Sequence, residues 1–260
     1  MALTYSSYLK LEQLLGLQAP RSDPEEHDEM LFIIIHQVYE LWFKLLLHEI
    51  DRAKWEFTAN DLFGAIARFK RMRTVLKTLV AQIDILETMS PISFLAFRDR
   101  LETASGFQSA QFRQMEFVLG LKRKEMLKHY EGEGNLYQAV EKRLRERSLV
   151  DHFYDLLAAM GTAIPAELRD KDLTAPNVAH PDIQAAIIRI YQAEPAMLVL
   201  VELMTDFDEG LQEWRYRHVK MVERTIGNKR GTGGSPGVEF LKQSLFQPVF
   251  PDLWAIRSEL

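Results

Sequence analysis

The residue best placed for metal chemistry in this chain is His218. It belongs to a series of six side chains separated by three or four residues, namely Met204, Phe207, Leu211, Trp214, His218 and Met221. That period places all six on one buried stripe of a helix. An imidazole there is either a core histidine bonded to a carbonyl or carboxylate, or an axial ligand of haem iron whose other ring nitrogen meets a further acceptor. The spacing leaves both roles open.

A second histidine, His36, lies on another apolar face. Phe32, His36, Tyr39 and Phe43 follow one another at spacings of four, three and four. Aromatic walls around an imidazole suit a flat ligand, although aromatic residues at helical spacing also form ordinary core. His36 and His218 lack the H-E-x-x-H spacing of a zinc site and the Glu-x-x-His carboxylates of di-iron bundles. Haem therefore suits them better than a bare ion.

The other five histidines lie among charges, near predicted helix ends or in a proline-rich loop, where a solvated or capping role is expected. They are His27, His48, His129, His152 and His180.

Two further segments have residues suited to a small ligand. Arg98 lies four residues after Phe94, and an arginine among aromatic residues suits bidentate capture of a carboxylate. A solvated or ion-paired arginine is the alternative. Residues 229–237 contain four glycines, follow a predicted helix and lack the G-K-[ST] ending of a phosphate loop. We interpret them as a mobile lid that offers backbone amides and the Thr232 hydroxyl.

The elements that must position these residues are helices. Apolar periodicity and breakers predict helices over residues 25–53, 60–90, 94–101, 108–119, 136–160 and 195–226, with a loop over 161–181. The alternating patterns of strands are absent from the sequence. The predicted fold class is therefore all-α, a single-domain helical bundle.

Composition narrows the function classes. With 260 residues, 47% of them hydrophobic, the chain can bury a large core. Acidic and basic residues are interleaved at a net charge of -5, so no nucleic-acid partner is expected. The absence of cysteine excludes thiolate nucleophiles, disulfides, iron–sulfur clusters and covalent haem attachment. Neither a signal peptide nor a membrane span is evident, so we expect a cytoplasmic protein with no membrane partner.

As a set, these segments resemble the tryptophan 2,3-dioxygenase family. The resemblance runs nearly end to end and includes residues 27–32 (HDEMLF), 36–37 (HQ), 40–42 (ELW), 97–98 (FR), 105–109 (SGFQS), 214–218 (WRYRH), 229–234 (KRGTGG) and 250–254 (FPDLW). Several of these motifs are long and specific.

The resemblance implies a role for each matching residue. His218 matches the axial haem ligand, and His36 matches the distal histidine that bonds the indole nitrogen. Arg98 and Thr232 match residues that hold the carboxylate and ammonium groups of the substrate.

Other matches concern the surroundings of the ligand. Phe32 and Phe94 match walls of the indole pocket, and some members carry tyrosine in place of Phe94. Ser105 and Gly106 match a segment beside the distal face of the haem. Tyr5, Tyr8 and Leu9 fall in an N-terminal segment that enters a neighbouring subunit's site. Pro236, where the family commonly has serine, is a departure that affects the lid.

The implied function is a haem b enzyme, with one haem per subunit, that uses O2 to cleave the indole C2–C3 bond of L-tryptophan and gives N-formyl-L-kynurenine. The implied assembly is a homotetramer in which residues 1–24 are exchanged and residues 25–260 form the haem-binding domain. Two alternatives remain at this point: a haem enzyme that oxidises a modified tryptophan or another indole, and a non-enzymatic haem or tryptophan sensor or interaction bundle.

Overall fold

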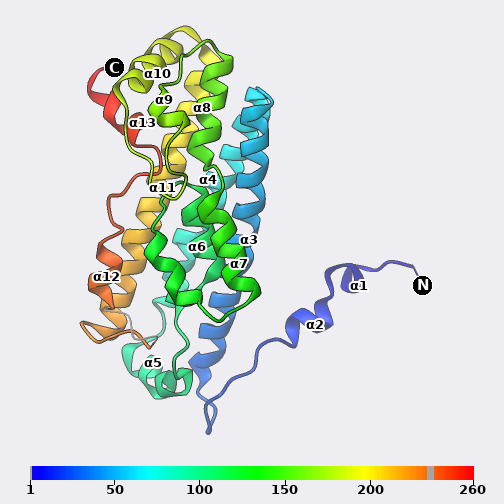
Figure 1. The fold of residues 1–260 in the computed structure, drawn as a ribbon. Coiled ribbons are helices and arrows are strands. Elements are labelled where there is room, and N and C mark those ends of the chain that lie inside the picture. The colour runs from blue at the N-terminus through cyan, green and yellow to red at the C-terminus, as the bar shows by residue number, and fades with distance from the viewer. Residues whose placement is uncertain (1, 233–236) are drawn as a thin grey trace.

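Three long helices form the axis of the molecule. The computed structural model describes residues 2–232 and 237–260, and in it α3 (His27–Thr58), α4 (Leu62–Leu86) and α11 (Pro195–Ile226) run side by side (Figure 1). The central α4 contacts both of the others, through fully buried side chains such as Phe69, Leu79 and Phe207. Within the described residues there is no strand, so the all-α prediction is confirmed.

Local signals set the ends of these helices. The Asp61 carboxylate accepts a hydrogen bond of 2.9 Å from Gly64 N and caps α4. Pro195 occupies the first turn of α11, and Gly227 ends that helix with a φ of 58°. Ser90 caps α5 (Pro91–Arg98), so this helix begins three residues before the predicted position.

The predicted single helix over 136–160 is wrong. The structure has two helices there, α7 (Asn135–Arg145) and α8 (Leu149–Ala159). Ser148 caps α8 because its hydroxyl accepts from Asp151 N, while the Asp151 carboxylate accepts from Ser148 N at 2.7 Å. This capping box starts a new helix within a continuous apolar pattern.

The predicted loop over 161–181 contains one short helix, α9 (Ala166–Arg169), and precedes an unpredicted one, α10 (Pro181–Ala193). The His180 ring caps α10 by accepting from Asp182 N at 3.2 Å, as the expected capping role of this histidine requires.

Short elements complete the chain. They are η1 (Asp99–Leu101), η2 (Gly106–Gln108), α6 (Ala110–Val118), η3 (Lys124–Tyr130), α12 (Val238–Lys242), α13 (Pro251–Ala255) and η4 (Ile256–Ser258).

The N-terminal arm leaves the bundle. Its two short helices, α1 (Tyr5–Leu9) and α2 (Leu11–Leu15), project away from the other helices (Figure 1). The buried Glu29 carboxylate fixes the base of the arm, because it accepts hydrogen bonds from Arg21 N and Ser22 N at 2.8 and 2.9 Å. The arm therefore has a fixed origin and an exposed end.

Helix α3 is apolar and long enough to cross a membrane by length and composition. It nevertheless contacts α4, α6 and α8, and its Leu46, Ile50 and Phe57 side chains are fully buried among them. These contacts are those of a core helix in a bundle.

A buried carboxylate anchors the C-terminal segment. Asp208 on α11 has no exposed surface, and it accepts hydrogen bonds from Val249 N, Phe250 N and Trp254 Nε1 at 3.0, 2.9 and 2.9 Å. The carboxylate thereby satisfies the buried backbone donors of Val249 and Phe250 and the partly buried indole donor of Trp254.

We therefore expect Asp208→Ala to lower the free energy of unfolding by roughly 3 kcal/mol or more, because each buried donor left unpaired costs about 1–3 kcal/mol. Urea denaturation followed by circular dichroism measures the change. Asp206→Ala is the matched control: Asp206 lies on the same helix in a partly exposed pair with Arg73, which contributes at most about 1 kcal/mol. Equal losses in the two variants would contradict the anchoring role.

Candidate active site

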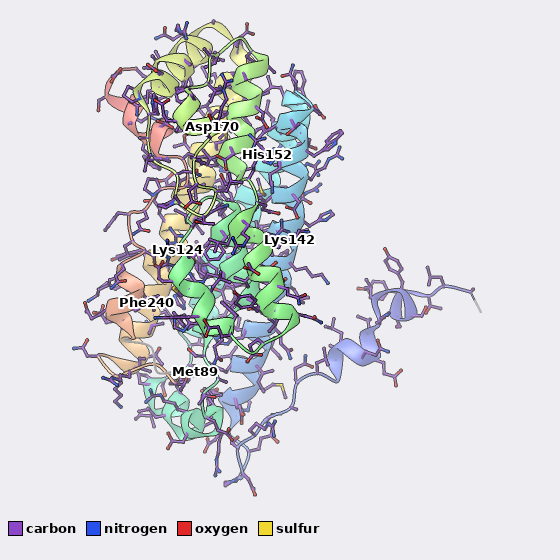
Figure 2. The ribbon with its side chains drawn as sticks, in the orientation of Figure 1. Met89, Lys124, Lys142, His152, Asp170 and Phe240 are labelled. Atoms are coloured by element: carbon purple, nitrogen blue, oxygen red, sulfur yellow. The ribbon has the colours of Figure 1, made fainter. Side chains whose placement is uncertain are left out.

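A cavity of about 290 Å³ lies among α3, α4, α5, α6 and α11 and is closed by parts of segments 101–109 and 231–244. Figure 2 places two residues of its lining, Met89 and Phe240, in the half of the bundle nearer α5, away from His152 and Asp170. The lining includes eight of the residues singled out in the sequence: Phe32, His36, Phe94, Arg98, Ser105, Gly106, His218 and Thr232. One pocket thus collects residues separated by up to 200 positions.

His218 presents a free imidazole to this pocket. Burial, together with the neighbouring His36, lowers its pKa to about 4, so the ring is neutral at neutral pH. Among the described residues, neither ring nitrogen has a hydrogen-bond partner, including the further acceptor expected for a ligating histidine. The ring is instead held by Trp214, one turn earlier, which stacks on it at 5.3 Å between centroids and 8° between planes.

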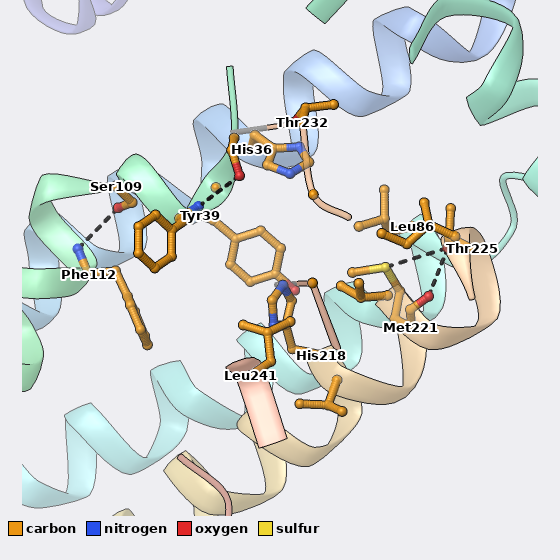
Figure 3. A pocket seen from close by; sticks show the side chains of 18 of the residues that line it. His36, Tyr39, Leu86, Ser109, Phe112, His218, Met221, Thr225, Thr232 and Leu241 are labelled. Atoms are coloured by element: carbon orange, nitrogen blue, oxygen red, sulfur yellow. Dashed lines mark hydrogen bonds between the residues drawn. The ribbon is translucent and has the colours of Figure 1, made fainter. Parts of the chain in front are cut away.

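His36 projects into the same pocket from α3 (Figure 3). Its Nδ1 lies 2.7 Å from the carbonyl oxygen of Phe32, which can only accept, so Nδ1 carries the proton. Burial lowers the pKa of His36 below its ordinary value and keeps the ring neutral. Nε2 is therefore the acceptor atom of this ring.

A row of aromatic rings forms the wall beside His36. The Phe32 ring lies 4.1 Å from the His36 ring and 5.7 Å from the Phe94 ring, measured between centroids. Phe97 packs at 5.5 Å against both phenylalanines and closes the wall from inside the core. The arrangement favours a flat, apolar ligand.

The polar residues on the loop side of the pocket are bonded to backbone carbonyls. Arg98 Nη2 donates to the carbonyl of Arg230 at 2.6 Å, and the Thr232 hydroxyl donates to the carbonyl of Ala104 at 2.5 Å. Both bonds connect the start of the glycine-rich segment to the rim of the pocket. An anionic ligand would offer Arg98 a stronger acceptor than a carbonyl.

Ser105 and Gly106 form the rim itself. The Ser105 hydroxyl accepts from Phe107 N at 3.3 Å and starts η2. A Cβ atom added at Gly106 would meet nothing within 4 Å, so packing within this chain does not require glycine there. The open space beside Gly106 admits close approach of a ligand.

Two predictions concern residues elsewhere. Tyr5 and Tyr8 are 76% and 69% exposed on the arm and do not line this chain's pocket. Pro236 lies outside the described residues.

Sequence reasoning missed a charged cluster in the lining, formed by Arg113, Glu116, Arg123 and Arg215. One signal for it was present, because Arg215 lies three residues before His218 and so shares its side of the helix. Arg215 and Glu116 are 99 residues apart, so no short-range sequence pattern indicates that they pair.

An all-α bundle whose pocket presents two neutral imidazoles, a wall of phenylalanines and an arginine has the features of a protein that binds a flat aromatic ligand. The chain belongs to the tryptophan 2,3-dioxygenase family, whose sequence profile matches residues 1–145 and 177–260. The unmatched residues, 146–176, include α8 and α9, which contribute nothing to the pocket lining.

Individual relatives match over the whole chain. A tryptophan 2,3-dioxygenase of Herpetosiphon aurantiacus is 54% identical, covering 100% of this chain and 99% of its own length. Those of Anaeromyxobacter dehalogenans and Kineococcus radiotolerans are 49% and 42% identical, covering 100% and 99% of this chain and 97% and 91% of their own lengths.

The His36 geometry makes a spectroscopic prediction. We expect the Nδ1–H tautomer at pH 7, the less common form in water, and a titration midpoint below 6.5 because burial disfavours the charged ring. Long-range ¹H–¹⁵N spectra of histidine-labelled protein measure both, with His36→Gln to identify the signal. An Nε2–H tautomer would contradict the assigned hydrogen bond.

Proposed function

We propose that this chain is a haem-dependent tryptophan 2,3-dioxygenase, which uses O2 to cleave the indole C2–C3 bond of L-tryptophan and gives N-formyl-L-kynurenine. The observation that carries the proposal is the neutral, unpartnered imidazole of His218 in an aromatic pocket. We further propose that the enzyme works in the cytoplasm as a homotetramer with one haem b per subunit.

The residues of the pocket fit haem. The His218 ring lines the pocket and its nitrogens have no hydrogen-bond partner among the described residues, so the ring is available to coordinate iron. His218 would be the axial ligand, with Trp214 fixing its ring, and the Ser105–Gly106 rim would accept a flat macrocycle in its open space. Because the chain has no cysteine, the haem would be held without covalent bonds. When bound, the iron supplies the activation of O2.

The protein's own task is to hold tryptophan in one orientation. Phe32 and Phe94 would contact the faces of the indole ring, and His36 Nε2 would accept the hydrogen bond of the indole N–H. His36 is neutral and its acceptor atom is fixed by the Nδ1 bond, so we assign it orientation of the substrate. A substrate held in this way has its reacting double bond in one place and excludes water from it.

Arg98 and Thr232 would hold the amino-acid end. Each donates to a loop carbonyl, and the substrate carboxylate would replace the carbonyl at Arg98 with a charged acceptor. Binding of substrate would then rearrange the bonds made by Arg230 and Thr232, and we propose that segment 229–237, of which residues 233–236 lie outside the described part of the chain, acts as a lid.

The proposed tetramer rests on exposed apolar surface. The arm exposes Leu3, Tyr5, Tyr8, Leu9, Leu14, Leu15 and Leu17. We propose that residues 1–24 insert into a neighbouring subunit, where Tyr5 and Tyr8 would complete its substrate pocket, while residues 25–260 form the haem-binding domain. On α3, Ile34, Leu41 and Trp55 are 42%, 51% and 54% exposed at spacings of multiples of seven, which supports helix packing between subunits.

The first test replaces the proposed axial ligand. Protein reconstituted with haem should show a Soret band and convert L-tryptophan to a product with both atoms from labelled O2. His218→Gly should weaken haem binding by about 100-fold or more, since even the partners of a ligating histidine contribute 10–100-fold, and added imidazole should restore the band. The exposed His48→Gly on α3 is the control. Unchanged haem binding by His218→Gly would refute the ligand, and one labelled oxygen atom would refute the dioxygenase.

The second test concerns Arg98. Loss of a charge-assisted pair in a buried site costs about 2–5 kcal/mol, so Arg98→Gln should raise the KM for L-tryptophan roughly 30-fold or more. The exposed Arg100→Gln, two residues away, is the control. 3-Ethylindole, which lacks the carboxylate, should be used equally by both variants. A KM unchanged in Arg98→Gln would remove the assigned role.

A further inference from the structure

Three arginines gathered around one glutamate occupy one wall of the pocket. The Glu116 carboxylate on α6 contacts Arg113 on the same helix, and Arg123 Nη2 lies 3.2 and 3.1 Å from its two oxygens. Arg215 of α11 approaches the same carboxylate at 3.4 Å. Glu116, Arg113 and Arg215 are only 2%, 4% and 3% exposed, so two of the three guanidinium groups that share this carboxylate are buried, and the third, that of Arg123, is partly exposed.

The positive charge of this wall is not balanced by the protein around it. The charged lining of the pocket consists of four arginines (Arg98, Arg113, Arg123 and Arg215) and two glutamates (Glu40 and Glu116). Glu40 accepts from Gln111 at 2.8 Å, and Asp208, the other acid that acts on Arg215, already accepts from Val249 N, Phe250 N and Trp254. Buried cations without counter-charges are costly, so an anion is expected here.

Hydrogen-bond donors also remain unused. Within the described part of the chain, the buried Nε atoms of Arg113 and Arg215 have no acceptor. Arg215 Nη1 is otherwise directed to the carbonyls of Ser244 and Gln247, at 3.4 and 3.1 Å. Each unpaired buried donor costs about 1–3 kcal/mol, so an acceptor supplied by a ligand in the pocket would stabilise the cluster.

The surroundings restrict the shape of the anion. Arg215 precedes His218 by three residues on α11, so the cluster and the free imidazole face one pocket. The guanidinium of Arg113 lies 6.0 Å from the Phe107 ring, and that of Arg123 lies 5.8 Å from the Phe240 ring. The two rings also pack on each other at 5.0 Å. Cations beside aromatic surface suit a flat apolar ligand with carboxylates at its edge.

We propose that Arg113, Arg123 and Arg215, held together by Glu116, form a carboxylate subsite that receives the peripheral carboxylate groups of the haem. This subsite rests on the proposed haem function of the pocket. The amino-acid carboxylate is the other source of the same chemistry, and the geometry assigns it to Arg98, which lies at the loop side and has an exchangeable carbonyl partner.

The test compares two ligands that differ only in these carboxylates. The protein freed of haem is titrated with ferric haem and with its dimethyl ester, and the Soret band reports both dissociation constants. The wild-type chain should bind haem at least 10-fold more tightly than the ester. Arg123→Gln, chosen because Arg123 is the least buried arginine of the cluster at 24% side-chain exposure, should weaken haem binding about 10-fold and leave ester binding unchanged.

Arg71→Gln is the matched control, because Arg71 also pairs with a buried glutamate, Glu49 at 2.8 Å, but lies outside the pocket. It should leave both dissociation constants unchanged. Equal binding of haem and ester by the wild type, or equal weakening of both by Arg123→Gln, would overturn the subsite alone. Failure to bind either porphyrin would overturn the proposed function as well. A raised KM for L-tryptophan in haem-loaded Arg123→Gln, with haem binding unchanged, would assign the cluster to the substrate and overturn the proposal.

Discussion

The site depends on the imidazole of His218, whose ring nitrogens have no hydrogen-bond partner among the described residues. The side chain lines a largely apolar pocket, and most polar side chains in such surroundings have a hydrogen-bond partner. Here the imidazole lies on the 32-residue helix α11 and stacks against Trp214, and α11 itself contacts α4, α12 and α13. The long helices therefore hold the basic nitrogen of His218 in a pocket where no described residue donates a hydrogen bond to it.

The two histidines of the pocket show how one hydrogen bond separates two roles. Both rings are neutral because burial lowers their pKa values. His36 Nδ1–H donates a hydrogen bond to the carbonyl of Phe32, one turn earlier on the same helix, and Nε2 remains as a single acceptor with a fixed direction. Within the described part of the chain His218 has no such bond, and its ring stacks on Trp214. The first arrangement suits recognition of an N–H group, and the second suits coordination to a metal.

Much of the fold could be predicted from the sequence, because long helices with one buried face give a strong periodic pattern of apolar residues. The errors came from local signals inside such patterns. The capping box of Ser148 and Asp151 divides a region predicted as one helix, and Pro181, interpreted as the end of a loop, is the first residue of α10. Proline favours the first turn of a helix, which makes the two interpretations difficult to separate.

Only part of the site could be predicted from the sequence. Helical spacing singled out His36 and His218, yet spacing cannot distinguish a core histidine from a ligand, since the difference lies in a tertiary hydrogen bond that is present or absent. The resemblance to a known family supplied the roles of Arg98 and Thr232. The cluster around Glu116 was not predicted because its arginines come from three separate segments. Arg215 and Glu116 are 99 residues apart, so no short-range sequence pattern connects them.

The two groups of arginines in the pocket differ in a way that matches two kinds of ligand. Arg98 is bonded to one backbone carbonyl of the glycine-rich segment, a neutral partner that a charged ligand can displace. Breaking this bond offsets part of the free energy of ligand binding, which limits the affinity of Arg98 for a substrate that must be released after each turnover. The cluster is instead pre-organised by a buried carboxylate that ties α6 to α11, so its guanidinium groups need no rearrangement when an anion arrives. Pre-organisation reduces the cost of binding and favours retention, which is the requirement for a resident cofactor.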